Sequence, residues 1–506
     1  MLSKVKSCGL LGIDGYMVNV ETDINNGLPS FEIVGLGDTA VKEAKERVRA
    51  AIKNSGFEFP MKRITVNLAP ADLRKEGSAL DLPIAIGILT ATGSVSPLSV
   101  GNYIITGELS LDGGIKPIKG ALSMALCAVH EGIKNFILPV ENADEAAVVK
   151  GLNVLPANNI RDVADHLNGV KGINSHCIEI EEIYKNCEDY EHDFCDVKGQ
   201  ENVKRALEIV AAGSHSCLMV GPPGSGKTML ARRLPTILPP LTFEEALEVT
   251  RIYSIAGYLP AKTPLITKRP FRSPHHTISA VALTGGGKYP KPGEISLAHN
   301  GVLFLDEIPE FDKKTLEAMR QPLEDGHVTI SRLNASIVYP SKTTLILAAN
   351  PCPCGNASDP SKACTCTPWQ VRNYLGKLSG PLLDRVDLYM EIFPVKYKEL
   401  DYEGEGEKSG VIRERVVSAR KMQIERYKGL NIYSNSQLQP NLINKFCKLD
   451  NECKALIKNA YEKLGLSARA YGRILKVSRT IADLDGKENI ELKHLAEAIQ
   501  YRVKHG

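Results

Sequence analysis

Near the middle of the 506-residue chain runs Leu218-Met-Val-Gly-Pro-Pro-Gly-Ser-Gly-Lys-Thr228, an apolar segment followed by the pattern G-x-x-x-x-G-K-T. The apolar segment predicts a buried strand and Thr228 to Leu234 predicts a helix, so the glycines form the loop between them. Glycine lets such a loop curl until its backbone N–H groups bind phosphate oxygens. In this pattern Lys227 reaches the β- and γ-phosphates of a nucleotide, and the Thr228 hydroxyl ligates Mg²⁺. The predicted ATP-binding residues are Gly221, Pro222, Pro223, Gly224, Ser225, Gly226, Lys227 and Thr228.

Two later apolar segments end in polar side chains that suit the same site. Gly301-Val-Leu-Phe-Leu-Asp-Glu307 predicts a buried strand that ends in two carboxylates. We expect Asp306 to hold Mg²⁺ through water and Glu307 to polarise the attacking water, which makes hydrolysis the expected reaction. Thr344-Leu-Ile-Leu-Ala-Ala-Asn350 predicts a third strand, whose terminal Asn350 can orient that water. This asparagine also precedes a proline and can initiate a turn, and the two roles are compatible.

The order of these elements resembles that of the AAA+ ATPases, in which a helical lid follows the third strand. The resemblance implies a parallel α/β core and rings in which a neighbour's arginine completes each site. Gly380-Pro-Leu-Leu-Asp-Arg-Val-Asp387 matches the arginine-finger segment of those proteins, with Arg385 as the finger. A salt bridge with either aspartate of the segment is the alternative role of this arginine. Ser467-Ala-Arg-Ala-Tyr-Gly-Arg473 resembles the sensor-2 segment of the magnesium-chelatase branch, with Arg469 as the sensor and Arg473 as its support.

The overall charge does not indicate a nucleic-acid partner. The chain carries 62 Lys and Arg residues against 59 Asp and Glu residues, a net charge of +3. Hydrophobic residues make up 43% of the sequence, which excludes a mostly disordered protein. DNA binding would therefore need a local cationic patch that the total charge hides.

The apolar and cysteine content favours a cytoplasmic protein without membrane contact. The segment from Leu82 to Gly107 has no charged residue, but Pro83, Gly87 and Gly93 interrupt it. It therefore predicts a buried helix and a loop instead of a membrane span. We expect no signal peptide at the start of the sequence. The twelve cysteines of such a chain argue against a disulfide framework.

The most specific motifs lie between Arg269 and Arg332. They include Arg269-Pro-Phe-Arg-Ser-Pro-His-His-Thr-Ile-Ser279 and Gly293-Glu-Ile-Ser-Leu-Ala-His-Asn-Gly-Val-Leu-Phe-Leu-Asp-Glu-Ile-Pro-Glu-Phe311. With them, essentially the whole chain resembles the YifB/ComM family of magnesium-chelatase-like AAA+ proteins. The resemblance implies a ring, expected to be a hexamer, that hydrolyses ATP to move along single-stranded or branched DNA. It implies a helicase that promotes branch migration during DNA recombination and natural transformation.

The same resemblance implies two hairpins that point into the pore of the ring. One is expected near Thr284 to Pro292 and the other from His327 to Tyr339, with its turn at Leu333-Asn334. The candidate DNA contacts in these hairpins are Lys288, Lys291 and Arg332. Solvated loop residues without a ligand are the alternative for each of them. His275 and His276 lack further ligands at a set spacing, so we interpret them as loop or interface residues.

Residues 1–170 are similar to the proteolytic domain of Lon. The similarity lies in Ile104-Ile-Thr-Gly-Glu-Leu-Ser-Leu-Asp-Gly-Gly-Ile-Lys-Pro-Ile-Lys-Gly-Ala-Leu122 and implies a Lon-protease-like (ribosomal S5 domain 2-like) α+β fold. Lon uses a Ser–Lys dyad, but Ala79 and Leu122 stand at the dyad positions, and Ser78 lies one residue early. We therefore expect a domain without protease activity that serves ring assembly or grasps DNA.

Breaks in composition divide the chain into four parts. The predicted parts are a Lon-like domain at 1–170, an acidic linker at 171–195, an AAA+ core at 196–397 and a helical lid of the magnesium-chelatase C-terminal type at 398–506.

Four cysteines are clustered within the predicted core. Asn350-Pro-Cys352-Pro-Cys354 and Cys364-Thr-Cys366 make the pattern C-x-C-x₉-C-x-C, which supplies enough thiolates for a tetrahedral structural Zn²⁺. Zinc knuckles commonly use the wider C-x₂-C spacing, and four reduced surface cysteines are the alternative. A zinc site here would brace the loop between the strand that ends at Asn350 and the arginine-finger helix.

Two other functions stay open at this point. One is the motor subunit of a magnesium chelatase, which inserts Mg²⁺ into a porphyrin, although a Lon-like domain has no evident use there. The other is a protein-remodelling or regulatory ATPase, in which an aromatic pore residue would thread polypeptide. Tyr289 is the candidate for that role, and it could equally stack on a base.

Overall fold

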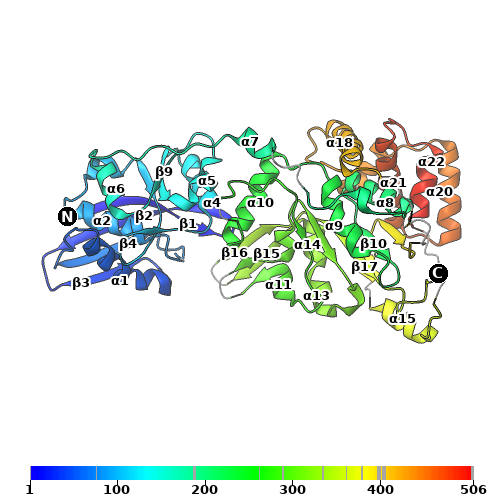
Figure 1. The fold of residues 1–506 in the computed structure, drawn as a ribbon, viewed down its shortest axis with the longest axis horizontal. Helices are drawn as coiled ribbons and strands as arrows, with labels where there is room; N and C mark the ends of the chain where they lie inside the picture. Colours follow the sequence, from blue (N-terminus) through cyan, green and yellow to red (C-terminus); the bar gives the residue numbers. More distant parts are fainter. Residues whose placement is uncertain are drawn as a thin grey trace. The chain divides into compact units, whose positions relative to one another are not determined.

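The chain folds into two compact units (Figure 1). The computed structural model describes residues 2–75, 77–185, 190–260, 262–287, 290–332, 335–359, 362–377, 380–383, 385–395, 401 and 406–502. Unit 1 contains Met1–Cys187, Phe243–Thr267 and Ser331–Tyr339, and unit 2 contains Glu188–Thr242, Lys268–Ile330 and Pro340–Gly506. Both units combine helices with a sheet, so the predicted α/β class is confirmed.

Unit 1 is built on a seven-stranded mixed sheet in the order β3-β4-β2-β1-β5-β8-β9. Its strands are β1 (Leu2–Leu11), β2 (Asp14–Asn25), β3 (Ser30–Val34), β4 (Arg63–Ala69), β5 (Tyr103–Ile105), β8 (Asn135–Pro139) and β9 (Asn153–Ala157). β2 pairs antiparallel with β1 and β4, and the other neighbours are parallel. Val18, Val20 and Ile24 alternate along β2 and are buried, which places one face of the sheet against the core.

The first unit also contains short and medium helices. They are α1 (Thr39–Asn54), α2 (Asp81–Ala91), α3 (Pro97–Val100), α4 (Ala121–His130), α5 (Ala143–Ala147), α6 (Ile160–Leu167) and α7 (Ile180–Lys185). Every residue of α2 is buried, as the charge-free segment predicts. α7 forms inside the predicted linker, because Ile180, Ile183 and Tyr184 recur at helical spacing there. None of the described helices combines the length and the apolar character that crossing a bilayer requires.

An ion pair joins α1 to α2 in the core of unit 1. Arg47 Nε lies 2.7 Å from Asp81 Oδ2, and Asp81 is only 1% exposed. Burial raises the pKa of Asp81, and the hydrogen bond from Arg47 opposes that shift. Arg47→Ala leaves the buried carboxyl without this partner, so we expect the free energy of unfolding to fall by about 3–5 kcal/mol. Urea unfolding followed by circular dichroism measures this change, with Lys42→Ala on the exposed side of α1 as the control. A loss below about 1 kcal/mol, typical of a surface pair, would contradict this account.

The helix α10 (Phe243–Ala256) belongs to unit 1, although it lies inside the range predicted for the AAA+ core. Arg251 Nη2 donates to Ile13 O at 2.8 Å and to Asp14 Oδ1 at 2.5 Å, at the turn between β1 and β2. Ser254 Oγ accepts from Gly120 N at 2.8 Å, at the start of α4. These bonds explain why a helix between two motifs of the nucleotide site packs with the N-terminal domain.

Unit 2 is built on a five-stranded parallel sheet in the order β11-β14-β17-β10-β18. Its strands are β10 (Cys217–Val220), β11 (Phe271–Arg272), β14 (Val302–Leu305), β17 (Thr344–Ala349) and β18 (Leu388–Glu391). Every residue of β14 and β17 is buried. Their continuous apolar sequences are those of strands covered on both faces, which is usual for a parallel α/β sheet.

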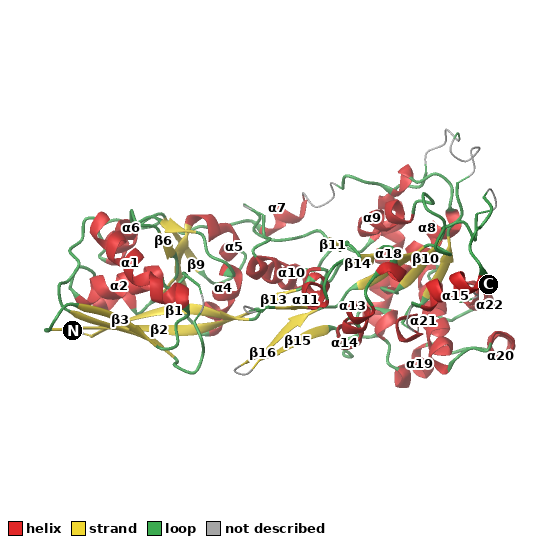
Figure 2. Cartoon of the chain, turned by 90° about the horizontal axis from the view of Figure 1, so that it is seen from below, coloured by secondary structure: helices red, strands yellow, loops and turns green. Residues whose placement is uncertain are grey.

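A helical region follows the sheet in unit 2 (Figure 2). Its helices are α18 (Ser409–Arg426), α19 (Pro440–Phe446), α20 (Asn451–Leu464), α21 (Ala468–Leu484) and α22 (Leu492–Gln500). They share one hydrophobic core with α8 (Glu201–Gly213) and the sheet, in which Leu207, Met219, Ile474 and Leu495 are buried together. The predicted lid therefore packs on the sheet within a single unit.

Strand pairs lie at both predicted hairpins. β12 (Gly285–Gly286) pairs antiparallel with β13 (Lys291–Pro292), and β15 (His327–Arg332) and β16 (Ala335–Pro340) form a second two-stranded sheet (Figure 2). The Lys291 side chain is exposed. Lys288, Tyr289 and the Leu333-Asn334 turn lie outside the described residues, as does the side chain of Arg332.

Candidate nucleotide-binding site

The predicted phosphate loop connects β10 to α9 (Lys227–Ile237). Gly224 and Gly226 have φ angles of 78° and 88°, which residues with a Cβ disfavour. A Cβ at Gly221 would lie 2.4 Å from Ile392 O, so this position also requires glycine. The loop leads into the N-terminus of an 11-residue helix, whose unpaired N–H groups favour an anion.

Lys227 is held inside this loop. Its Nζ donates to Gly221 O at 2.6 Å, to Pro222 O at 3.0 Å and to Asn350 Oδ1 at 3.2 Å. Burial lowers the pKa of Lys227, and the charges of Asp306 and Glu307 oppose that shift. Ser225 Oγ is buried and has no hydrogen-bond partner among the described residues. An unsatisfied hydroxyl beside a lysine and a helix N-terminus fits a phosphate group.

Thr228 and Asp306 meet at the same end of the sheet. Thr228 Oγ1 donates to Asp306 Oδ2 at 2.7 Å, although the two residues lie far apart in the sequence. Asp306 Oδ1 accepts from Glu307 N at 2.9 Å, which fixes the carboxylate. A hydroxyl and a carboxylate are oxygen ligands of the kind that Mg²⁺ prefers next to phosphates.

Glu307 has a partner that sequence reasoning missed. His276 Nδ1 lies 3.5 Å from Glu307 Oε2. The His276 ring also packs on His275, with the ring centroids 4.0 Å apart. Glu307 adopts φ of 50°, and its side chain is half exposed. The histidine therefore lies beside the half-exposed carboxylate, a contact that the spacing of residues in the sequence does not indicate.

Asn350 lies between Lys227 and a buried tyrosine. Besides accepting from Lys227, its side chain lies near Tyr374 on α15 (Pro368–Gly376). Burial raises the pKa of Tyr374 to about 12, so the phenol stays protonated at neutral pH. The end of the third strand is thus tied to the phosphate loop through Lys227 and lies near α15.

Arg385 lies at the opposite end of the sheet from the phosphate loop of its own chain. Ser216 Oγ donates to Arg385 O at 2.5 Å, and Ser216 precedes β10, whereas Gly221 follows it. Five residues of extended strand separate these two ends by roughly 16 Å. The guanidinium pairs with Glu324 on α14 (Arg320–Asp325). Asp387 pairs with His215 and Arg473, and Asp384, the other aspartate named as an alternative partner, lies outside the described residues.

Positive charges gather around Arg385. Burial lowers the pKa of Arg385, and the charges of Arg320, Arg473 and Arg469 add to the shift. Its Nη1 is buried and has no hydrogen-bond partner among the described residues. Arg469, the predicted sensor, therefore lies in the neighbourhood of Arg385, the predicted finger, away from the phosphate loop of the same chain.

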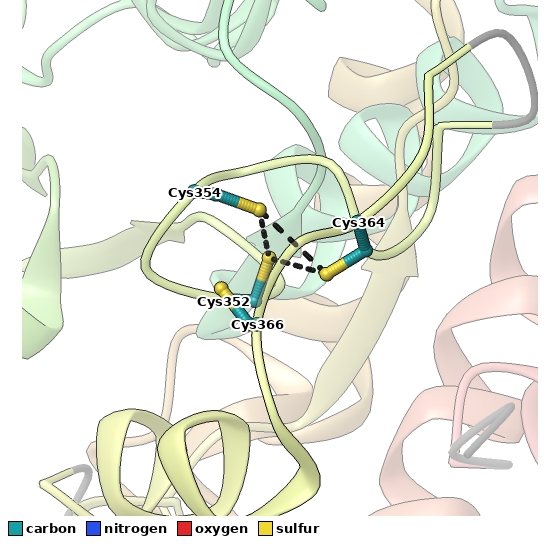
Figure 3. A group of neighbouring side chains, drawn as sticks. All are labelled: Cys352, Cys354, Cys364 and Cys366. Carbon is teal, nitrogen blue, oxygen red and sulfur yellow. Dashed lines mark hydrogen bonds between the residues drawn. The ribbon is translucent and has the colours of Figure 1, made fainter.

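The four clustered cysteines converge (Figure 3). Cys352 Sγ lies 3.4 Å from Cys354 Sγ and 3.7 Å from Cys364 Sγ, and the latter two are 3.6 Å apart. With Cys366, all four Sγ atoms lie within 4.8 Å of one another. Hydrogen bonds from backbone N–H groups, that of Asn356 first, lower the pKa of Cys354 to about 5. Burial and the neighbouring thiols raise the pKa of Cys364, and raise that of Cys366 to about 12, so among these three thiols only Cys354 is a thiolate at neutral pH.

The structure also describes the residues that stand at or next to the positions of the Lon dyad. The Ser78 hydroxyl donates to the Glu108 carboxylate, and Leu122 is fully buried in α4. Ala79 and Leu122 carry no nucleophile or base, so the absence of protease activity stays the prediction for this unit.

Comparisons with known proteins identify the family of this chain. Family models described as magnesium chelatase subunit ChlI match residues 193–400 and 20–142, and the model of its C-terminal part matches residues 406–502. The YifB protein of Escherichia coli K12 is 45% identical over 507 residues, which cover 99% of this chain and 97% of that protein. The chain belongs to the YifB/ComM family of magnesium-chelatase-like AAA+ proteins.

Two other relatives match this chain, one over nearly its whole length and one over about a third of it. Competence protein ComM of Haemophilus influenzae is 44% identical over 504 residues, which cover 99% of this chain and 97% of that protein. A Lon protease of Mycolicibacterium smegmatis is 27% identical over 164 residues, 30% of this chain and 21% of that protein. Membership of the YifB/ComM family indicates an ATPase that uses ATP and Mg²⁺.

Proposed function

We propose that this chain hydrolyses ATP at the site formed by Lys227, Thr228, Asp306, Glu307 and Asn350. The convergence of these five residues on the phosphate loop carries the proposal. Lys227 and the loop N–H groups bind the phosphates, and Thr228 and Asp306 hold Mg²⁺, which neutralises phosphate charge when bound. Glu307 accepts a proton from the attacking water, and Asn350 orients that water.

A second part of the proposal is a ring, in which each site is completed by the neighbouring subunit. Arg385 cannot serve the phosphate loop of its own chain from the far end of β10. A neighbour's loop docked beside these arginines would meet Arg385 and Arg469 together. Arginine at that position stabilises the charge that develops as the phosphoryl group is transferred. A hexamer is the ring that the family resemblance implies.

The third part is the work done by hydrolysis. We propose that the ring moves along single-stranded or branched DNA, as a helicase for branch migration in recombination and natural transformation in the cytoplasm. The name of its relative, a competence protein, supports this choice. The hairpin strands β12–β13 and β15–β16 carry Lys291 and Arg332, and Lys288 lies between the first two. Such cations would contact phosphates without reading sequence.

The DNA part has a direct test. We expect forked or single-stranded DNA to raise the rate of phosphate release at low salt, and the gain to shrink as salt rises. Lys227→Ala serves as the inactive control, and Lys291→Ala should lower the DNA affinity without changing the basal rate. Hydrolysis without any effect of DNA, and no strand displacement, would refute the motor and leave the ATPase. Stimulation by unfolded protein instead would favour a remodelling ATPase.

A further inference from the structure

We propose that Cys352, Cys354, Cys364 and Cys366 hold one Zn²⁺ and that this ion keeps the phosphate loop in position for ATP. The cluster then does more than stabilise a surface loop, because occupancy of the metal site would set the affinity for nucleotide. The coupling rests on the proposed ATPase function, whereas the metal site itself does not.

The sulfur positions suit a tetrahedral ion. A Zn–S bond of about 2.3 Å places the sulfur atoms of a tetrahedron about 3.8 Å apart. The Sγ separations among Cys352, Cys354 and Cys364, 3.4, 3.6 and 3.7 Å, approach that value. The sulfurs come from two segments, so the ion would cross-link Cys352 and Cys354 to Cys364 and Cys366 (Figure 3). Four thiolates in this arrangement select zinc or iron over the harder divalent ions.

The turn inside the cluster has the backbone of a metal knuckle. Gly355 has φ of 81°, and its N–H donates to Cys352 O at 3.0 Å. This bond fixes the turn in place before the ion binds, as supporting groups around metal sites commonly do.

The same turn lies directly against the phosphate loop. A Cβ at Gly355 would lie 2.5 Å from Pro223 Cδ and 2.7 Å from its Cγ, so the backbone of the turn touches the proline ring. Two residues before the cluster, Asn350 Oδ1 accepts from Lys227 Nζ at 3.2 Å. The cluster therefore meets the phosphate loop through Pro223 and through Lys227.

Loss of the ion would release both contacts. Without the cross-link, the loop from Cys352 to Cys366 regains conformational freedom. Pro223 then loses the turn that backs it, and Asn350 loses the anchor that follows it in the chain. The phosphate loop must be ordered again when ATP binds, and that ordering weakens the apparent affinity.

The first experiment measures metal and nucleotide together in the full chain. Elemental analysis of the purified protein should find about one zinc per chain. We expect the Cys354→Ser/Cys364→Ser variant to lose the zinc and to bind a fluorescent ATP analogue about 10-fold more weakly or worse. Cys177→Ser, at an exposed cysteine of unit 1, is the matched control and should change neither. Trp369 on α15 is the only tryptophan of the sequence. A change in its fluorescence emission therefore reports a structural change in the segment that follows the cluster.

A second variant changes the contact between Gly355 and Pro223 without removing a metal ligand. Gly355→Ala keeps all four thiols, but it strains the turn at φ of 81° and pushes a methyl group against Pro223. It should retain zinc and still bind ATP more weakly. It therefore tests the coupling even if the Cys354→Ser/Cys364→Ser variant does not fold. Less than about half an equivalent of zinc, or iron in its place, would overturn the metal assignment. Normal ATP affinity in zinc-free or Gly355→Ala protein would overturn the coupling alone. Failure of the unmodified, zinc-loaded chain to bind ATP would refute the proposed ATPase together with the coupling, leaving the zinc site standing.

Discussion

Glu307→Gln should bind ATP as the parent chain does but hydrolyse it about 10²- to 10⁴-fold more slowly, the usual contribution of a general base. Glutamine has the shape of glutamate and can still face His276, but it cannot accept the proton of the attacking water. Binding of a fluorescent ATP analogue measures the first effect, and phosphate release measures the second.

A neighbouring acid provides the control for this substitution. Glu310 follows Glu307 by three residues and is exposed, and its nearest charged partner is Lys377, 3.9 Å away. Glu310→Gln should leave the rate within about twofold of the parent, because a solvated surface pair contributes little. A Glu307→Gln chain that hydrolyses ATP near the parent rate would show that another group activates the water.

Arg385→Ala should lower the rate of hydrolysis by about 10³-fold or more, the range measured for arginine fingers. Nucleotide binding to a single subunit should change little, because Arg385 lies at the far end of β10 from the phosphate loop of its own chain. Arg372→Ala, at an exposed position of α15, is the control for the loss of a positive charge.

Mixing two inactive variants shows which chain the arginine serves. Lys227→Ala lacks a working phosphate loop but keeps its arginine, and Arg385→Ala has the reverse defect. In a mixed ring, some interfaces join an intact phosphate loop to an intact arginine, so activity should return. No recovery in rings shown to contain both variants would mean that Arg385 does not act across the interface.

The nucleotide site was accessible to sequence reasoning because its signals are local. The spacing of Gly221, Gly226, Lys227 and Thr228 encodes a loop that only such residues form. Apolar runs that end in Asp306 and Asn350 indicate buried parallel strands, and parallel strands bring their carboxyl ends to one edge. The structure brings these side chains together as predicted.

Other contacts could not be predicted from the spacing of residues in the sequence. Glu324 reaches Arg385, and His276 reaches Glu307, only because helices and strands distant in sequence pack side by side. The grouping of α10 with unit 1 depends on Arg251 and Ser254, which look like ordinary surface residues in the sequence. No periodicity or motif distinguishes these residues from solvated ones.

For the cysteine cluster, too, the sequence predicts the metal ligands, whereas only the tertiary structure shows what the cluster contacts. The pattern of Cys352, Cys354, Cys364 and Cys366 was enough to predict a four-thiolate site, since nearby ligands need only a short loop to converge. That Gly355 presses on Pro223 depends on the strand order β14-β17-β10, which brings the end of β17 beside the start of the phosphate loop. Local patterns specify which chemistry the chain can hold, whereas packing between distant segments decides which sites touch and can influence one another.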